Sequence, residues 1–312
     1  MLTRLLHSLP VLVLVSVLVF GLTLLIPGDP VTAMLGPGNA ADPQAVEALR
    51  ERLRLNDPIP VQYAAWLASA LKGDFGSSIV TGEPVLDALV YRLPITLELA
   101  VLSTIVAVIV AVPTALFAAT RKDSGWDTSI SALGTLGLAF PNFWIAVLLV
   151  LLFAVGLRWL PASGYVPFAE DPGGHLIRLI MPVIALAMPV AAVMIRQLRN
   201  STIEVLGTEH IRAARAKGVP ERRLLARHVI PNATIAPLTI LGVDFISLLG
   251  GSLAIETIFR IPGIGSYFVD AVFTRDLPVV QGGALVFALV AIVINLVVDV
   301  ISWTIDPRIS RG

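Results

Sequence analysis

The sequence predicts an all-α, polytopic membrane protein. We expect six transmembrane helices, a structured external loop after the first, and a short cytoplasmic helix between the fourth and fifth. Hydrophobic residues make up 56% of the 312 residues and charged residues only 14%, whereas soluble domains carry about 25% charged residues. Six apolar segments also reach the roughly 20 residues that a helix needs to cross a bilayer.

The first apolar segment follows Arg4 and could also indicate a signal peptide. It is longer than the roughly 7–15 residues of an apolar signal core, and Val31–Ala33 is a poor cleavage site. We therefore expect a membrane anchor. The six predicted spans are Leu5–Ile26, Pro94–Ala119, Ile130–Phe153, Leu176–Ile195, Ile235–Ile255 and Gln281–Trp303.

The distribution of basic residues predicts the orientation in the membrane. Basic short loops stay in the cytoplasm, and the loop between the fourth and fifth spans is the most basic. With six spans, both termini then lie in the cytoplasm. The basic residues of that loop are Arg196, Arg199, Arg212, Arg215, Lys217, Arg222, Arg223 and Arg227, against the acids Glu204, Glu209 and Glu221.

The same orientation places residues 27–93 outside the membrane. Asp42-Pro43 is a helix start signal, and Tyr63, Trp66 and Leu67 recur at helical spacing. We therefore expect a folded cap. The chain divides into an N-terminal segment with the first span (1–26), this cap (27–93) and a five-helix core (94–312) that contains a cytoplasmic loop at 196–232.

Within that loop, helix signals bracket a segment of about ten residues. Gly207 suits a left-handed end of the preceding helix, and Thr208 can cap a new one. Gly218 and then Pro220 end it. Isolated helices this short are marginal in water, so we expect this one to dock on a surface.

The residues of this helix favour a protein as its partner. Small side chains along two neighbouring strips allow close approach, and basic side chains supply charge at the rim. A basic loop could instead contact lipid head groups, but a helix lying on lipid has a large apolar face. Here only Ile211 and several alanines are apolar. The docking residues are Glu209, Arg212, Ala213, Ala214, Arg215, Ala216, Lys217 and Gly218.

This segment resembles the EAA signature of bacterial ATP-binding-cassette importer permeases. Ala213-Ala214 precedes Gly218 by four residues, and Arg227–Ala233 follows, although Arg212 stands where the signature has glutamate. Other blocks resemble the dipeptide/oligopeptide/nickel permeases of that family along nearly the whole chain. They are Leu25–Pro30, Gly73–Ser78, Arg92–Leu99, Leu160–Gly164, Pro262–Gly265, Pro278–Gly282 and Asp306–Arg308.

The resemblance implies a peptide importer in the bacterial cytoplasmic (inner) membrane. It implies a second, homologous permease subunit, two ATPase subunits inside and a substrate-binding protein outside. ATP and Mg²⁺ would bind the ATPase subunits and no cofactor would bind this chain, which we expect not to be an enzyme. The resemblance also places the helix near Glu209–Gly218 in a groove of an ATPase subunit.

Polar residues within predicted spans are candidates for the substrate path, because charge inside a membrane is costly. Asp244 lies deepest and either lines a water-filled path or pairs with a base. Ser247, Gly250 and Gly251 give the fifth span a small-residue face that suits either the path or plain helix packing. Glu98 is expected at a span end. Glu256 is expected to face water near Arg260.

Several other functions lack their motifs. The chain has no cysteine, no Gly-x4-Gly-Lys-Ser/Thr phosphate loop, no metal-ligand spacing among its four histidines and no nucleic-acid-binding module. An ion-coupled secondary transporter remains an alternative but should show inverted repeats, and a membrane-embedded enzyme should show paired catalytic residues. Within the importer family the cargo stays open among dipeptides, longer peptides, nickel chelates and haem.

Overall fold

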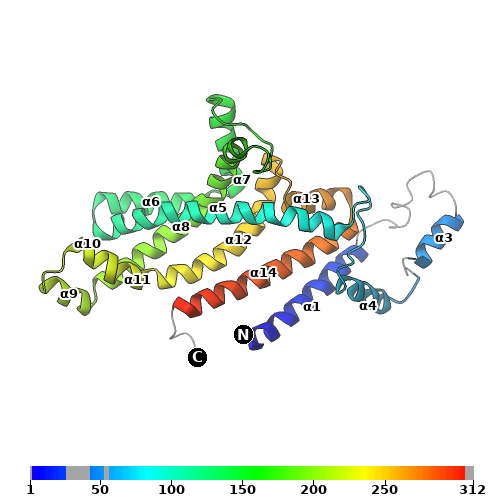
Figure 1. Cartoon of the computed structure of the whole chain (residues 1–312), viewed down its shortest axis with the longest axis horizontal. Helices are drawn as coiled ribbons and strands as arrows, with labels where there is room; N and C mark the ends of the chain where they lie inside the picture. Colours follow the sequence, from blue (N-terminus) through cyan, green and yellow to red (C-terminus); the bar gives the residue numbers. More distant parts are fainter. Residues whose placement is uncertain (1, 26–42, 53–55, 306–312) are drawn as a thin grey trace. The chain divides into compact units, whose positions relative to one another are not determined.

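The computed structural model of this chain describes residues 2–25, 43–52 and 56–305. Their regular secondary structure is helical (Figure 1). The chain divides into two compact units, Met1–Leu93 with Tyr267–Ile292, and Pro94–Ser266 with Val293–Gly312. The helices are α1 (Leu2–Leu25), α3 (Pro43–Arg52), α4 (Ile59–Ala70), α5 (Val85–Thr120), α6 (Gly125–Ala139), α7 (Asn142–Leu149), the π-helical η1 (Val150–Gly156), α8 (Pro172–Leu206), α9 (Glu209–Ala216), α10 (Glu221–Leu224), the π-helical η2 (Leu225–Val229), α11 (Ile230–Ala233), α12 (Ile235–Phe259), α13 (Ile264–Thr274) and α14 (Leu277–Ile305).

In the first unit, aromatic residues pack α4 against α1. The ring centroid of Phe20 lies 5.5 Å from that of Tyr63 and 5.7 Å from that of Trp66. The hydroxyls of Ser16 and Tyr63 are 2.8 Å apart. The helical stretches predicted for residues 27–93 are confirmed where the structure describes them, since α3 begins at Pro43. Its expected cap, Asp42, lies outside the described residues.

A buried aspartate in the same unit joins the segment before α5 to the start of α14. The carboxylate of Asp276 accepts hydrogen bonds from the Ser78 hydroxyl, at 2.5 Å, and from the Ile79 N–H, at 3.1 Å. A Cβ on Gly282 would press against Phe75, so this glycine permits close packing. Two of the sequence blocks, Gly73–Ser78 and Pro278–Gly282, therefore meet in one corner.

Long apolar helices dominate the described part of the chain. Four of them, α5, α8, α12 and α14, are long and apolar enough to cross a membrane, and α6 with α7–η1 passes that test as a bent pair. In α1 the described apolar stretch is Pro10–Gly21, which is shorter than a span. Within the described residues the six predicted spans fall on helices, the third of them on two, but the number that crosses the membrane stays a prediction.

The third predicted span, Ile130–Phe153, is not one continuous helix. Its two halves meet at an angle of 100°. The break lies at Phe140, whose backbone is extended (φ −100°, ψ 129°), and α7 starts just after Pro141. A proline ring clashes with a helical backbone at the preceding residue. The continuous span predicted over Ile130–Phe153 is therefore broken at Phe140 and Pro141.

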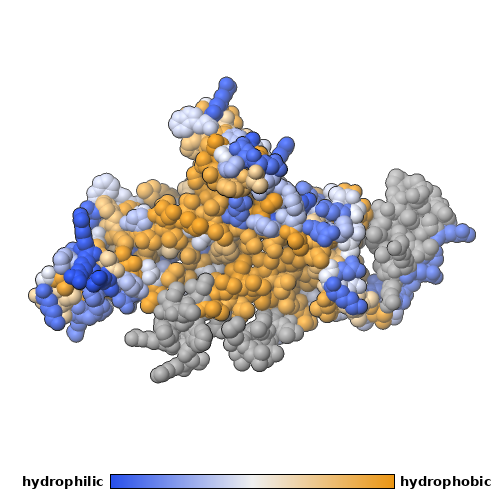
Figure 2. All heavy atoms as spheres, viewed as in Figure 1, coloured by the Kyte–Doolittle hydropathy of each residue, from blue (hydrophilic) through white to orange (hydrophobic). Residues whose placement is uncertain are grey.

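The long helices keep small residues inside and large ones outside. On α5, Ala107, Ala111 and Ala115 are fully buried, whereas Ile105 and Ile109 are exposed. Figure 2 shows apolar residues covering the visible face of α5 and α12. Since lipid is as apolar as leucine, membrane helices associate through close backbone packing at small residues. This inside-out pattern is what a lipid-facing surface requires.

The central helix of the second unit is α8, which packs against α6, α7 and α12 (Figure 1). Its buried face includes Leu186, Val190 and Leu198. Two prolines, Pro182 and Pro189, lie inside it without ending it, as membrane helices allow. The C-terminal end of α8 carries the short helix α9.

Candidate functional site

The short helix predicted after Thr208 is present as α9. Gly218 follows it with φ +77°, the left-handed conformation that ends helices, and α10 starts just after Pro220. Two details of the prediction were wrong. Gly207 has an ordinary helical conformation (φ −78°, ψ −10°). The Thr208 hydroxyl donates to the carbonyl of Val205 instead of capping α9, because it lies against the last turn of α8.

The helix α9 is anchored on its own chain mainly by the side chain of Ile211. Ile211 is fully buried in a cluster with Leu198 of α8 and Leu224 of α10. Ala115, Val229 and Ala233 complete this cluster, which we call the α9 anchor. Burying an isoleucine side chain contributes about 1.5–3 kcal/mol. This anchor could not be predicted from the sequence, because a single isoleucine gives no apolar periodicity.

The anchor divides the predicted docking residues into two groups. Ala214 is partly buried against the cluster, so it faces the body of the chain. The other predicted residues are exposed, and Figure 2 shows a hydrophilic surface at the α9–α10 end. The exposed ones are Glu209, Arg212, Ala213, Arg215, Ala216, Lys217 and Gly218.

Two of the basic side chains in this segment have partners within the chain. An Nη atom of Arg212 donates to the Gly207 carbonyl at 2.8 Å, which satisfies an acceptor at the end of α8. Arg215 forms an exposed ion pair with Glu221 of α10, where its Nε lies 3.0 Å from Oε1. Both contacts fold the segment onto itself, although exposed pairs contribute little. Lys217 is exposed beside them.

The candidate path residues on α12 lie on different faces. Ser247 and Gly250 are exposed and follow Val243 along one stripe. Gly251 faces the start of α7, where a Cβ would meet the side-chain amide of Asn142. Asp244 is half-buried between these faces. The structure thus gives Gly251 a packing contact and leaves Ser247 and Gly250 on an open surface.

The expectation that Glu256 faces water was wrong. Its side chain is fully buried. One carboxyl oxygen accepts from the hydroxyls of Thr96, at 2.8 Å, and Ser252, at 3.1 Å. The other accepts from the N–H of Ser266 at 2.9 Å. This carboxyl group therefore joins α5, α12 and the first turn of α13.

The turn around Glu256 explains why the block Pro262–Gly265 contains two glycines. A Cβ on Gly263 would collide with the Glu256 carboxyl group, and one on Gly265 would meet both Glu256 and Leu253. The turn begins where Arg260 adopts a left-handed conformation (φ 52°). A buried hydrogen-bond acceptor needs donors, and the glycines let backbone N–H groups approach close enough to donate to it.

A histidine pairs with the other predicted membrane acid. Nε2 of His175 lies 2.8 Å from a Glu98 oxygen, and its Nδ1 lies 2.7 Å from the Val166 carbonyl. His175 is 1% exposed. Because a carbonyl only accepts, Nδ1 carries a proton and Nε2 shares one with Glu98. The pair joins α5 to α8. The contact could not be predicted from the sequence, because the two residues lie far apart along the chain.

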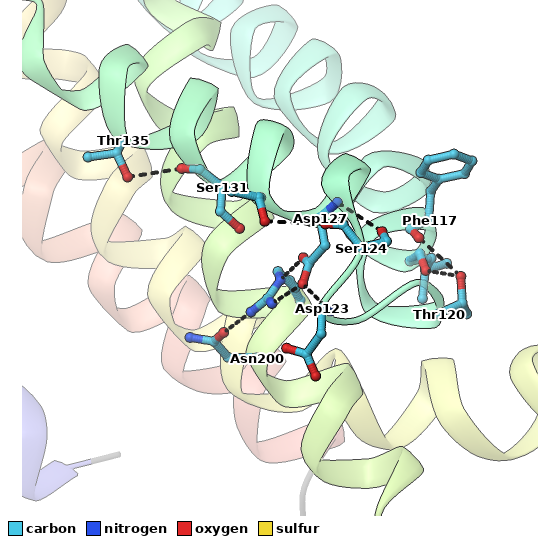
Figure 3. Close-up of polar contacts among 11 residues, drawn as sticks. Phe117, Thr120, Asp123, Ser124, Asp127, Ser131, Thr135 and Asn200 are labelled. Carbon is cyan, nitrogen blue, oxygen red and sulfur yellow. Dashed lines mark hydrogen bonds and ion pairs between the residues drawn. The ribbon is translucent and has the colours of Figure 1, made fainter.

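A third acid pairs with a base near the same end of the second unit as α9. Asp127, in the first turn of α6, is 3% exposed and accepts from Nε and an Nη of Arg199 on α8. It also accepts from the N–H of Asp123, and Ser124 caps α6 (Figure 3). Arg199 had been expected to be one of several loop bases. It is instead a helix residue in a bidentate ion pair.

Known proteins match this chain over nearly its full length. A sequence profile described as binding-protein-dependent transport system inner membrane component matches residues 111–311, and the N-terminal profile of such components matches residues 1–100. A Brucella abortus (strain 2308) protein, named as a candidate peptide transport system permease, is 41% identical over 308 residues, which are 99% of this chain and 98% of that protein.

Two further proteins extend these similarities. The glutathione transport system permease protein GsiC of Escherichia coli (strain K12) is 40% identical over 306 residues, covering 98% of this chain and 97% of that protein. A chain of the MetNI methionine ABC transporter, solved in inward-facing conformations, has a TM-score of 0.55 at 17% identity. The match covers 70% of this chain and 96% of that one, so the two share a fold.

Proposed function

Because this chain belongs to the family of binding-protein-dependent transport system inner membrane components, we propose that it is the permease subunit of an ATP-driven peptide importer. The observation that carries the proposal is α9, a short exposed helix ended by Gly218 and fixed to the long helix α8 through Ile211. A rigid attachment to α8 is what a segment needs to pass movement into the membrane.

The chain contributes one part of a larger assembly. Two ATPase subunits bind ATP and Mg²⁺ in the cytoplasm, and one of them receives α9 in a groove. A second, homologous permease completes the path, and an external substrate-binding protein delivers the cargo. This arrangement places both termini of the chain in the cytoplasm, the orientation that the basic residues of loop 196–232 favour.

In this assembly α9 acts as a lever and takes no part in chemistry. Closure of the ATPase pair moves the groove, and α9 moves with it. The anchor residues Ile211 and Leu198 carry that movement to α8. The ATPase drives the change only through contacts that differ between its open and closed states, since equal affinity for two states shifts neither.

The names of similar proteins support one cargo class. One is named for peptide transport and another for glutathione, itself a small peptide. We therefore propose short peptides as the cargo. A nickel chelate or haem, which we consider alternatives, would be identified by the ligand that copurifies with the substrate-binding protein.

The test is uptake into proteoliposomes that contain this chain, its partner permease and the ATPase subunits. We expect uptake of a labelled di- or tripeptide only with ATP, Mg²⁺ and binding protein present. A matched preparation with a hydrolysis-deficient ATPase should take up none. Uptake that persists in that preparation, driven by an ion gradient, would indicate the alternative of a secondary transporter.

A further inference from the structure

An ion pair between a buried aspartate and a partly exposed arginine lies next to the α9 anchor in sequence. Arg199 follows Leu198, whose side chain packs in the anchor, and Arg199 itself reaches Asp127 on α6. Successive residues of a helix point in directions about 100° apart. The last turns of α8 therefore hold α9 on one face, through apolar contact, and α6 on another, through charge.

The carboxylate of Asp127 accepts three hydrogen bonds. Arg199 donates to both of its oxygens, and the N–H of Asp123 donates to one of them as well (Figure 3). A bidentate arginine fixes orientation as well as distance. Asp123 has a left-handed backbone (φ 62°), so the turn between α5 and α6 is tied to the same carboxylate.

Aromatic contacts stiffen the corner between α5 and α6. The rings of Phe117 and Trp126 meet edge to face with centroids 6.1 Å apart. The guanidinium of Arg121 lies 3.8 Å from the centroid of Phe117, within cation–π range. Two residues before Phe117 on α5, Ala115 belongs to the α9 anchor. The corner and the anchor thus share both α5 and α8.

We propose that Asp127 and Arg199 are positioning residues that make the N-terminal end of α6 move together with α9. Movement received by α9 passes through the anchor to the end of α8 and, through this pair, to the bent helices α6 and α7. The proposal rests on the proposed coupling role of α9. It adds a second route by which movement of α9 reaches the membrane helices, and this route leads to the bent helices α6 and α7.

The first test measures whether α6 and the α9–α10 segment move as one body. The chain contains no cysteine, so spin labels can be attached at Ser129→Cys on α6 and Arg222→Cys on α10, both exposed positions. The distance between the labels is measured by pulsed electron paramagnetic resonance in the full complex. We expect the same narrow distribution without nucleotide and with ATP bound to a hydrolysis-deficient ATPase.

Weakening the pair should change that result. In Asp127→Asn and in Arg199→Lys, the ATP-bound distribution should broaden or shift, and ATP hydrolysed per peptide transported should rise by about 2- to 30-fold, the range that coupling mutations span. Asp127→Glu keeps a carboxylate and should restore part of the coupling. Thr135→Ala on α6 is the matched control, since that hydroxyl only bonds to Ser131 of its own helix.

If a single variant fails to assemble, a double variant that removes both charges tests the proposal instead. The double variant Asp127→Asn, Arg199→Gln leaves no uncompensated buried charge, the main cause of damage when one partner is removed. It should assemble at wild-type levels and still be uncoupled. Assembly together with normal coupling and an unchanged distance would overturn the positioning role, while a wild-type complex without ATP-dependent uptake would overturn the proposed function itself.

Discussion

At the scale of single residues, buried acids in this chain serve as hydrogen-bond acceptors between segments that are distant in sequence. Glu256 accepts from Thr96, 160 residues earlier, and from Ser266 in the first turn of α13. Asp276 accepts from Ser78, 198 residues earlier. Each acid has neighbours shaped to its oxygens. Substitution next to such an acid is therefore costly even when the change is small.

Gly263→Ala tests this for Glu256. The added Cβ would collide with the Glu256 carboxyl group, and overpacking of this kind costs about 1–3 kcal/mol. We expect a lower thermal unfolding midpoint for the detergent-purified chain. Gly250→Ala is the control, because nothing lies within 4 Å of its added Cβ and alanine favours a helix. Equal midpoints for the two variants would contradict the role assigned to Glu256.

Gly218 is the residue whose conformation ends α9. A side chain there adopts the left-handed region at a cost of about 1–2 kcal/mol, and asparagine tolerates it best. We expect Gly218→Val to lose peptide-stimulated ATP hydrolysis in the assembled complex and Gly218→Asn to retain most of it. Membrane insertion should be unchanged in both. Normal transport by Gly218→Val would show that the coupling site lies elsewhere.

At the scale of elements, α9 depends on tertiary contact because it is too short to be stable alone. Two turns of helix present exposed alanines and bases on one side and Ile211 on the other. The bent pair α6–α7 has a similar dependence, since both of its parts pack on α8. If such elements transmit movement, they can do so only while their contacts with α8 stay intact.

Ile211→Ala tests the anchor. Removing a buried isoleucine side chain costs about 2–5 kcal/mol, more than an isolated α9 can supply. We expect ATPase subunits to bind the variant permease at least tenfold more weakly, a loss of about 1.4 kcal/mol, measured by copurification over a concentration series. Ile109→Ala on α5 removes the same atoms from an exposed position and should bind normally. Equal binding by both variants would contradict the anchor.

At the scale of the whole molecule, features set by local sequence could be predicted, whereas contacts between residues far apart in the sequence could not. Apolar runs predicted every long helix, and Gly218 with Pro220 predicted the end of α9. Periodicity tells which face of a helix is apolar but not which residue lies opposite it. For this reason Glu256 was expected in water and Arg199 among loop bases, although each has a partner far along the chain.

The break at Phe140 leaves one property of the whole chain to be measured, the side of the membrane on which each loop lies. If α6 and α7–η1 together cross the membrane, the α5–α6 turn is cytoplasmic and the loop before α8 is external. If they form a re-entrant pair, both loops lie on one side. The basic residues of loop 196–232 favour the crossing arrangement, which also keeps both termini in the cytoplasm.

Single cysteines in this cysteine-free chain decide between the two arrangements. Lys122→Cys in the α5–α6 turn and Ser163→Cys before α8 are both exposed positions. In intact spheroplasts, a membrane-impermeant maleimide should label Ser163→Cys and should reach Lys122→Cys only after permeabilisation. Asp171→Cys, exposed in the same loop as Ser163, should label as Ser163→Cys does. Labelling of both loops from the outside, or of neither loop before permeabilisation, would contradict six spans and make α6–α7 a re-entrant element.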